Sequence, residues 1–168
     1  MPTFDPESVG AVFDHTAHAV PLIRPLLPLY RDLLGGEAVG GGFNEWGGHL
    51  AVHIRFPGGS CLELLEPIRS DSESVGNFLA RSPRGGLHHL TFKVQDLAVA
   101  IDRVRQLGLE PFGTRLDDEN WKETYLHPRH TSGVLIQLAQ AGPGIPPPFQ
   151  RTIEEILDES EARRAAGQ

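Results

Sequence analysis

The chain has 168 residues, with 22 Asp and Glu against 15 Lys and Arg, so its net charge is −7. This acidic balance argues against nucleic-acid binding, because affinity for phosphates comes mostly from Lys and Arg. No apolar run reaches 18 residues, so we expect no membrane span, and the first ten residues lack the pattern of a secretion signal. The single cysteine, Cys61, cannot form a disulfide within the chain and favours a cytoplasmic location.

The first half of the chain predicts a strand, a helix and then three strands. A β-leaning run at 12–20 precedes apolar residues at helical spacing over 22–34. Pro25 and Pro28 lie inside this stretch, so we expect a regular helix only from about Pro28, where proline suits a first turn. The three strands that follow are expected near 38–40, 49–56 and 60–66.

The second half repeats this order. It starts with a strand at 87–94, and Leu97 to Leu107 then has the periodicity of an amphipathic helix, which Gly108 closes. Three further strands are expected near 110–113, 122–126 and 133–139.

The segments outside these halves add two helices. Ser70 and Glu73 have capping-box spacing and predict a short helix in the linker, and Thr152 and Glu155 predict a terminal helix in the same way. The expected organisation is α+β. Its four parts are a first βαβββ module at 1–68, a linker helix at 69–86, a second βαβββ module at 87–141, and a proline-rich tether with the terminal helix at 142–168.

Residues that can bind a metal recur at a fixed interval. His15 and Glu63 lie 48 residues apart, and so do His89 and Gln137, which are the first pair displaced by 74 positions. Each residue alone would more often be a surface or structural side chain. Four independent residues have no reason to recur in this way, so the repeat predicts a metal centre with all four as ligands.

The alternation of side chains along the strands supports this prediction. In the strand at 87–94, Leu90 and Phe92 form a packing face, which sends His89 to the other side. In the last strand, Ile136 and Leu138 do the same for Gln137. The neighbouring His18 and His88 have the opposite parity, and we interpret them as structural or surface residues.

Several segments resemble the vicinal oxygen chelate superfamily, which includes glyoxalase I, methylmalonyl-CoA epimerase and extradiol dioxygenases, and they are most similar to its epimerase branch. These segments are 13–17, 62–67, 86–90, 126–128 and 133–138. The resemblance covers about residues 11–140 and implies two βαβββ modules whose sheets form an open, barrel-like cavity around a divalent ion. Its ligand positions fall on the four residues of the repeat. Two imidazoles and two side-chain oxygens suit Co, Ni, Zn, Mn or Fe.

The sequence departs from the epimerase pattern at Gln137. Epimerases carry there a glutamate that acts as ligand and proton-transfer group, whereas an amide does not accept a proton usefully. By the symmetry of the repeat the carboxylate and the amide have exchanged halves, so Glu63 could supply the base. The mirrored strand offers Glu123, and we expect Glu63 and Glu123 to form an acid/base pair, with His53 as the substitute; as an alternative, Glu123 is an ordinary surface charge.

Residues beside these acids are candidate substrate contacts, namely His53, Trp121 and Lys122. Trp46 and Trp121 occupy equivalent places in the repeat, and we expect them to be cavity walls or core anchors. A coenzyme A thioester would need basic residues for its phosphates, and Arg84, Lys122 and Arg129 are the candidates.

These residues predict a metal-dependent isomerase or lyase that acts on a small carbonyl or thioester compound through a metal-stabilised enolate. One alternative is an iron-dependent oxygenase that cleaves or hydroxylates an aromatic ring, with two histidines and one carboxylate as ligands. Another is a metal-free protein that binds small molecules such as drugs, an interpretation that the amide at Gln137 favours. The resemblance also implies a homodimer.

Overall fold

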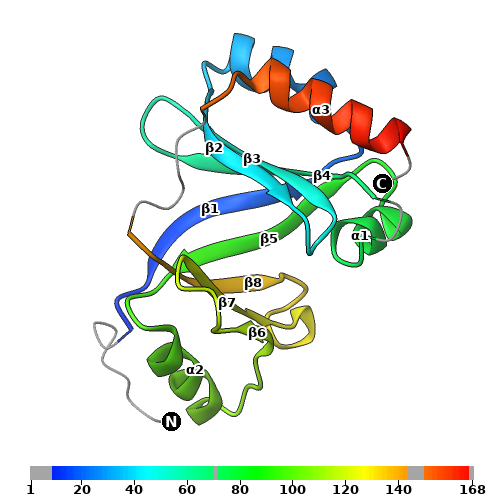
Figure 1. The fold of residues 1–168 in the computed structure, drawn as a ribbon. Coiled ribbons are helices and arrows are strands. Elements are labelled where there is room, and N and C mark those ends of the chain that lie inside the picture. Colours follow the sequence, from blue (N-terminus) through cyan, green and yellow to red (C-terminus); the bar gives the residue numbers. More distant parts are fainter. Residues whose placement is uncertain (1–8, 70–71, 144–149, 167–168) are drawn as a thin grey trace. The chain divides into compact units, whose positions relative to one another are not determined.

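The computed structural model describes residues 9–69, 72–143 and 150–166, and these form an α+β fold (Figure 1). The chain divides into two compact units. Unit 1 consists of Met1–His15 and His89–Ile145, and unit 2 of Thr16–His88 and Pro146–Gln168. The division falls within strand β1 (Val12–Ala19) and within strand β5 (Gly86–Lys93).

Unit 2 contains strands in the order β2-β3-β4-β1. Their bounds are Glu37–Asn44 for β2, His49–Arg55 for β3 and Cys61–Pro67 for β4. β2, β3 and β4 pair antiparallel, and β4 pairs with β1 in parallel, Ala17 lying opposite Glu63. Glu63 therefore leaves the sheet on the face opposite to Leu62 and Leu64, which are buried in the apolar core.

The segment 22–34 is irregular before Pro28, as its prolines predict, but the regular helix expected from about Pro28 is a π-helix. The structure has a 3-10 turn, η2, at Arg24–Leu26, followed by a π-helix, η3, at Pro28–Leu33. In a π-helix the N–H donates to the carbonyl five residues earlier, and here the N–H of Leu34 donates to the carbonyl of Leu29, at 3.0 Å. Pro25 and Pro28 each lack an N–H and crowd the preceding turn, which accounts for the interruption.

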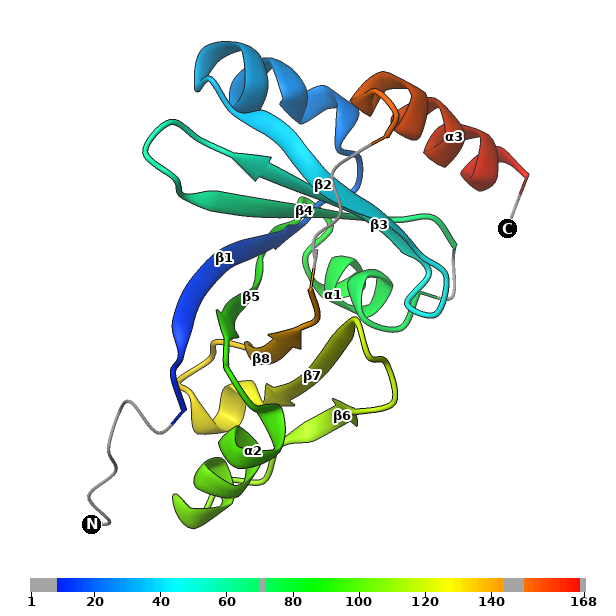
Figure 2. The ribbon, with the colours of Figure 1, turned by 60° about the vertical axis from the view of Figure 1, so that its left-hand side comes forward.

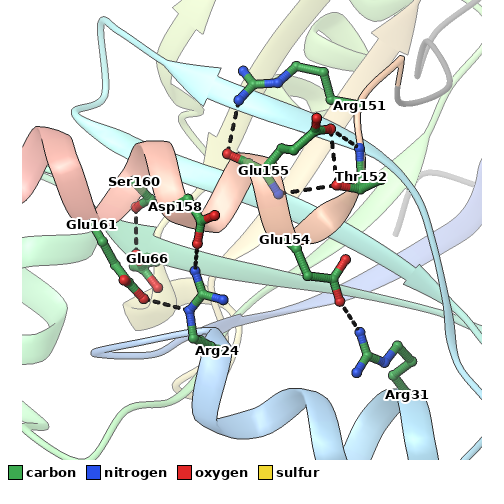
Figure 3. Close-up of polar contacts among 10 residues, drawn as sticks. All are labelled: Arg24, Arg31, Glu66, Arg151, Thr152, Glu154, Glu155, Asp158, Ser160 and Glu161. Carbon is green, nitrogen blue, oxygen red and sulfur yellow. Dashed lines mark hydrogen bonds and ion pairs between the residues drawn. The ribbon is translucent and has the colours of Figure 1, made fainter.

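The terminal helix α3 (Ile153–Ala165) covers one face of this sheet beside the η2–η3 segment (Figures 1 and 2). Ile153, Ile156 and Leu157 are buried in the same apolar cluster as Leu50 and Val52 of β3. The predicted capping box is confirmed, because Oγ1 of Thr152 accepts from the N–H of Glu155 while the Glu155 carboxylate accepts from the N–H of Thr152 (Figure 3). Burial of its apolar face anchors α3 to unit 2.

Unit 1 repeats the topology, with strands in the order β5-β8-β7-β6. Their bounds are Phe112–Arg115 for β6, Trp121–Leu126 for β7 and Ile136–Ala141 for β8, and a 3-10 turn, η4, occupies Pro128–His130. β5 pairs with β8 in parallel, and β8 and β7 are antiparallel. Helix α2 (Leu97–Gln106) packs Leu97, Ala100 and Ile101 against Leu138, as its periodicity predicts. The two units thus contain the same βαβββ order.

The linker helix and β2 differ from their predicted boundaries. The linker helix α1 (Val75–Arg81) begins after Ser74; of the predicted capping box, Ser70 lies outside the described residues, as does most of the proline-rich tether. β2 runs on through glycines that lower strand propensity. A Cβ on Gly41 would lie 2.1 Å from the carbonyl oxygen of Ala51, and its φ is 123°, so glycine is required there.

Among the described segments, none of the helices has the length and apolar character needed to cross a bilayer.

His18, on β1 in unit 2, gives a prediction for the pH dependence of stability. Burial lowers the pKa of His18 from its ordinary value of 6.5, so the unfolded chain binds this proton more readily. The contribution of neutral, buried His18 to the free energy of unfolding should therefore be fully present above pH 6.5. It should be lost as the pH falls below that value. Urea denaturation between pH 8 and pH 5 should show this fall in the wild type and a smaller one in His18→Gln. Equal pH dependence in both proteins would contradict the prediction.

Candidate metal centre

Three of the four predicted ligands lie together in unit 1. His15 on β1, His89 on β5 and Gln137 on β8 are 1%, 5% and 5% exposed. The ring centroids of His15 and His89 are 5.9 Å apart in an edge-to-face arrangement. Buried imidazoles and an amide on three neighbouring segments provide a set of nitrogen and oxygen donors removed from bulk water.

Asp14 fixes the orientation of His15. Its Oδ2 lies 2.7 Å from Nδ1 of His15, and its Oδ1 lies 2.8 Å from Nζ of Lys93. Burial acts to raise the pKa of Asp14, but the hydrogen bonds from His15 and Lys93 outweigh it and lower this pKa to about 2. Asp14 is therefore a carboxylate at neutral pH that holds the proton of His15 on Nδ1 and directs Nε2 to the opposite side, the arrangement common for metal-binding histidines.

Glu123 on β7 is not a surface charge, contrary to the alternative considered for it. It is 7% exposed. Its Oε2 accepts hydrogen bonds from Nε1 of Trp121 at 3.0 Å, from the hydroxyl of Tyr125 at 3.0 Å and from Nε2 of Gln137 at 2.8 Å. Its Oε1 lies 3.4 Å from a guanidinium nitrogen of Arg115. Four donors thus surround one buried carboxylate beside a predicted ligand.

The amide of Gln137 joins this carboxylate to His15. Its Nε2 donates to Glu123, and its Oε1 accepts from the hydroxyl of Thr91 at 2.7 Å. That hydroxyl oxygen lies 3.0 Å from Nε2 of His15. A continuous chain of polar contacts therefore runs from Asp14 to Glu123 within unit 1.

Unit 2 contains the fourth predicted ligand, Glu63. It lies directly opposite His53 in the pairing of β3 with β4, and Oε1 of Glu63 is 3.2 Å from Nε2 of His53. Both side chains are half-buried. The predicted acid and its predicted substitute are thus ion-pair partners when His53 is protonated.

The structure changes what the sequence led us to expect of Trp46 and Lys122. Trp46 is 76% exposed, so it is not a core anchor. Lys122 alternates with Trp121 and Glu123 along β7 and therefore leaves the strand on the other face from Glu123. Trp121 does contact Glu123, as described above.

The sequence did not identify as site residues five other polar members of this cluster, Asp14, Thr91, Lys93, Arg115 and Tyr125. Parity places Thr91 on the face of His89 in β5, but threonine on a strand is too common for its role in the site to stand out.

The donor set in unit 1 fits a divalent ion of the borderline class. Imidazole nitrogens with a side-chain amide oxygen suit Co, Ni, Zn, Mn or Fe, and the carboxylate behind His15 supports this chemistry. His15, His89 and Gln137 are therefore the residues of unit 1 that could hold such an ion.

Comparison with known proteins identifies the family. The sequence model of the glyoxalase-like domain matches residues 13–158. The chain belongs to the glyoxalase-like family. It is similar to the ethylmalonyl-CoA/methylmalonyl-CoA epimerase of Cereibacter sphaeroides, with 31% identity over 130 residues that cover 76% of this chain and 96% of that protein. The mitochondrial methylmalonyl-CoA epimerase of Mus musculus is 31% identical over 133 residues, which cover 76% of this chain and 72% of that protein.

Solved structures lead to the same group. Methylmalonyl-CoA epimerase from Mycobacterium tuberculosis has a TM-score of 0.72 and 26% identity, covering 85% of this chain and 95% of that one. A methylmalonyl-CoA epimerase in complex with methylmalonyl-CoA and NH4+ has a TM-score of 0.68 and 30% identity, covering 78% and 94%. These relatives confirm that this glyoxalase-like chain is a vicinal oxygen chelate protein close to methylmalonyl-CoA epimerase, with the predicted fold class, and that it is an enzyme of the isomerase type.

Proposed function

We propose that this glyoxalase-like chain is a divalent-metal-dependent epimerase of an acyl-CoA thioester whose reacting carbon lies between two carbonyl groups, as in methylmalonyl-CoA or ethylmalonyl-CoA. The relatives named above supply the substrate class. The observation that carries the proposal is the buried carboxylate of Glu123, hydrogen-bonded to Gln137 in the unit that holds His15 and His89. A buried carboxylate beside a set of metal donors is the arrangement that proton abstraction next to a carbonyl requires.

The proposed ligands are His15, His89 and Gln137, with Glu63 as the fourth on the strength of the sequence repeat. When bound, a divalent ion supplies Lewis-acid stabilisation of the negative charge that develops on a substrate oxygen. The amide of Gln137 is neutral, so in this proposal it can bind but does not transfer protons.

Glu123 is the proposed base. Its Oε2 is held by Trp121, Tyr125 and Gln137, which fixes the plane of the carboxylate. Oε1 has the longer contact, 3.4 Å to Arg115, and we assign it as the atom that takes the proton. A carboxylate held in one orientation loses little freedom when it reacts.

Glu63 is the proposed second proton-transfer group, with His53 as its partner. An epimerase removes the proton from one face of a carbon and returns it to the opposite face, so it needs two such groups. When Glu123 removes the proton, Glu63 must carry a proton to return to the opposite face, and His53, 3.2 Å away, is the neighbouring group that could supply it. A cytoplasmic location and a homodimer stay predictions from the sequence.

Exchange of the substrate's α-proton with solvent tests this proposal. We expect the protein loaded with Co2+ to exchange the α-proton of methylmalonyl-CoA in deuterated water and to interconvert its two epimers, as followed by proton NMR. Treatment with a chelator should stop both reactions, and added Co2+ should restore them. Succinyl-CoA, which has no carbon between two carbonyl groups, is the control and should not exchange. Absence of exchange with Co, Ni, Zn, Mn and Fe in turn would contradict the proposal.

A further inference from the structure

Thr91 of β5 is the buried residue that contacts both His15 and Gln137. Its side chain is 0% exposed, and the parallel pairing of β5 with β8 places it directly opposite Gln137. Its Oγ1 lies 3.0 Å from Nε2 of His15 and 2.7 Å from Oε1 of Gln137. A hydroxyl that is fully removed from water depends on such contacts for its hydrogen bonds.

The hydroxyl group of Thr91 donates its proton to the hydrogen bond with Gln137. The carboxylate of Glu123 can only accept hydrogen bonds. The amide atom of Gln137 that lies 2.8 Å from it must therefore be the nitrogen and not the oxygen. The amide oxygen is then the end that faces Thr91, and a carbonyl oxygen needs a donor. Thr91 has a single O–H to donate, and it donates to Gln137.

The oxygen of the same hydroxyl lies against the nitrogen of His15 that can bind a metal. Nδ1 of that ring faces Asp14, and because the O–H of Thr91 is donated to Gln137, the Thr91 oxygen accepts from the N–H at Nε2 of His15 in the metal-free protein. A metal ion at Nε2 would take the place of this proton. Nε2 of His15 and Oε1 of Gln137 are therefore held on either side of one atom, Oγ1 of Thr91.

We propose that Thr91 is a positioning residue of the metal centre, which directs the amide oxygen of Gln137 to the side of His15 Nε2. The inference rests on the proposed function in taking His15 and Gln137 as ligands. Thr91 itself is not a ligand in this proposal. Groups that orient metal ligands through hydrogen bonds are typically worth about 10- to 100-fold in metal affinity.

Two substitutions at Thr91 separate the hydroxyl from the shape of the side chain. Thr91→Val keeps the shape and removes the hydroxyl, and Thr91→Ser keeps the hydroxyl. The matched control is Thr124→Val, because Thr124 is also 0% exposed and its Oγ1 lies 2.7 Å from Oγ1 of Thr114, away from the proposed ligands. Affinity for Co2+ alone is measured by titration calorimetry and by the visible absorption of the bound ion.

We expect Thr91→Val to lower the affinity for Co2+ by about tenfold and to change the absorption spectrum of the bound ion, because one ligand is no longer oriented. Thr91→Ser and Thr124→Val should stay within about threefold of the wild type. A second measurement uses the 15N-labelled protein without metal and follows the NMR signals of the Gln137 side-chain NH2 group. These signals should shift in Thr91→Val and not in Thr124→Val, which tests the orientation of the amide independently of the ion.

Two results would overturn this inference and leave the proposed function standing. One is an affinity of Thr91→Val within about threefold of the wild type, and the other is an equal loss in Thr91→Ser, which would assign the effect to packing. A wild-type protein that binds no Co2+ would instead overturn the metal centre itself, and the inference with it. A Thr91→Val protein that does not fold would be replaced by the comparison of Thr91→Ser with Thr91→Ala.

Discussion

Glu123→Gln is expected to lower kcat for epimerisation about 10³-fold, the range in which a positioned acid or base contributes. Gln has the shape of Glu but does not accept a proton usefully at neutral pH. The Gln side chain can still present its oxygen to Trp121, Tyr125 and Gln137, so the fold and the affinity for thioester should change little. Initial rates with each epimer of methylmalonyl-CoA, together with the melting temperature and metal content, measure the effect.

The two proposed acid/base groups can be separated by the epimer on which each acts. If Glu123 serves one face of the reacting carbon and Glu63 the other, Glu123→Gln should retain solvent exchange of one epimer and Glu63→Gln that of the other. The control is Glu119→Gln, an exposed acid just before β7, which should be as active as the wild type. Interconversion by Glu123→Gln at the wild-type rate would remove Glu123 from the mechanism.

The sequence predicted the fold well where the pattern of apolar residues was uninterrupted. Helix α2 is found where five apolar residues follow a helical period, and it begins at the cap of Asp96. At 22–34 the same period was broken by Pro25, and the chain forms a 3-10 turn and a π-helix instead. Prolines decide the local hydrogen bonding there, while the burial of Ile23 and Leu27 still follows the pattern.

Parity and repetition predicted which faces carry the candidate site, but they do not distinguish its members by role. His15, His89 and Gln137 are buried together, whereas Trp46, which also recurs, is exposed. Asp14 and Thr91 act through contacts between residues far apart in the chain, and such contacts leave no local pattern. The chemistry of the network therefore had to come from the structure.

The repeat also contains a pair whose role is structural. In unit 1, Oε1 of Gln140 accepts a hydrogen bond from the N–H of Leu97, the first residue of α2, at 2.9 Å. In unit 2, Oε2 of Glu66 accepts from the N–H of Ile23, just before η2, at 2.5 Å. Equivalent side chains thus bind the beginning of the helical segment in each module, where free N–H groups need an acceptor.

Glu66 is charged where Gln140 is neutral, and the terminal helix α3 explains the difference. Its other oxygen, Oε1, accepts from the hydroxyl of Ser160 at 2.6 Å (Figure 3) and from the guanidinium of Arg164. Glu66 is 1% exposed and Ser160 0% exposed. The carboxylate therefore fastens α3 to β4 in addition to its role beside η2.

Substitution of Glu66 should destabilise unit 2 strongly. Glu66→Ala leaves the N–H of Ile23, the hydroxyl of Ser160 and the half-buried Arg164 without their acceptor, so we expect a loss of about 3 kcal/mol in the free energy of unfolding. Glu66→Gln installs the residue found at the equivalent position of unit 1. It should keep the bond to Ile23 and weaken the hold on Arg164, with a loss of about 1 to 2 kcal/mol.

Urea denaturation and amide hydrogen exchange measure these losses. The faster exchange in both variants should be concentrated in α3, because Ser160 and Arg164 lie there. The matched control is Asp158→Asn, which removes the exposed partner of Arg24 on the same helix (Figure 3) and should cost about 0.5 kcal/mol or less. Equal losses in Glu66→Gln and Glu66→Ala would assign the whole effect to Arg164 and Ser160. Unchanged exchange in α3 would contradict the role of Glu66 altogether, since a buried carboxylate that fastens a helix cannot be removed without loosening it.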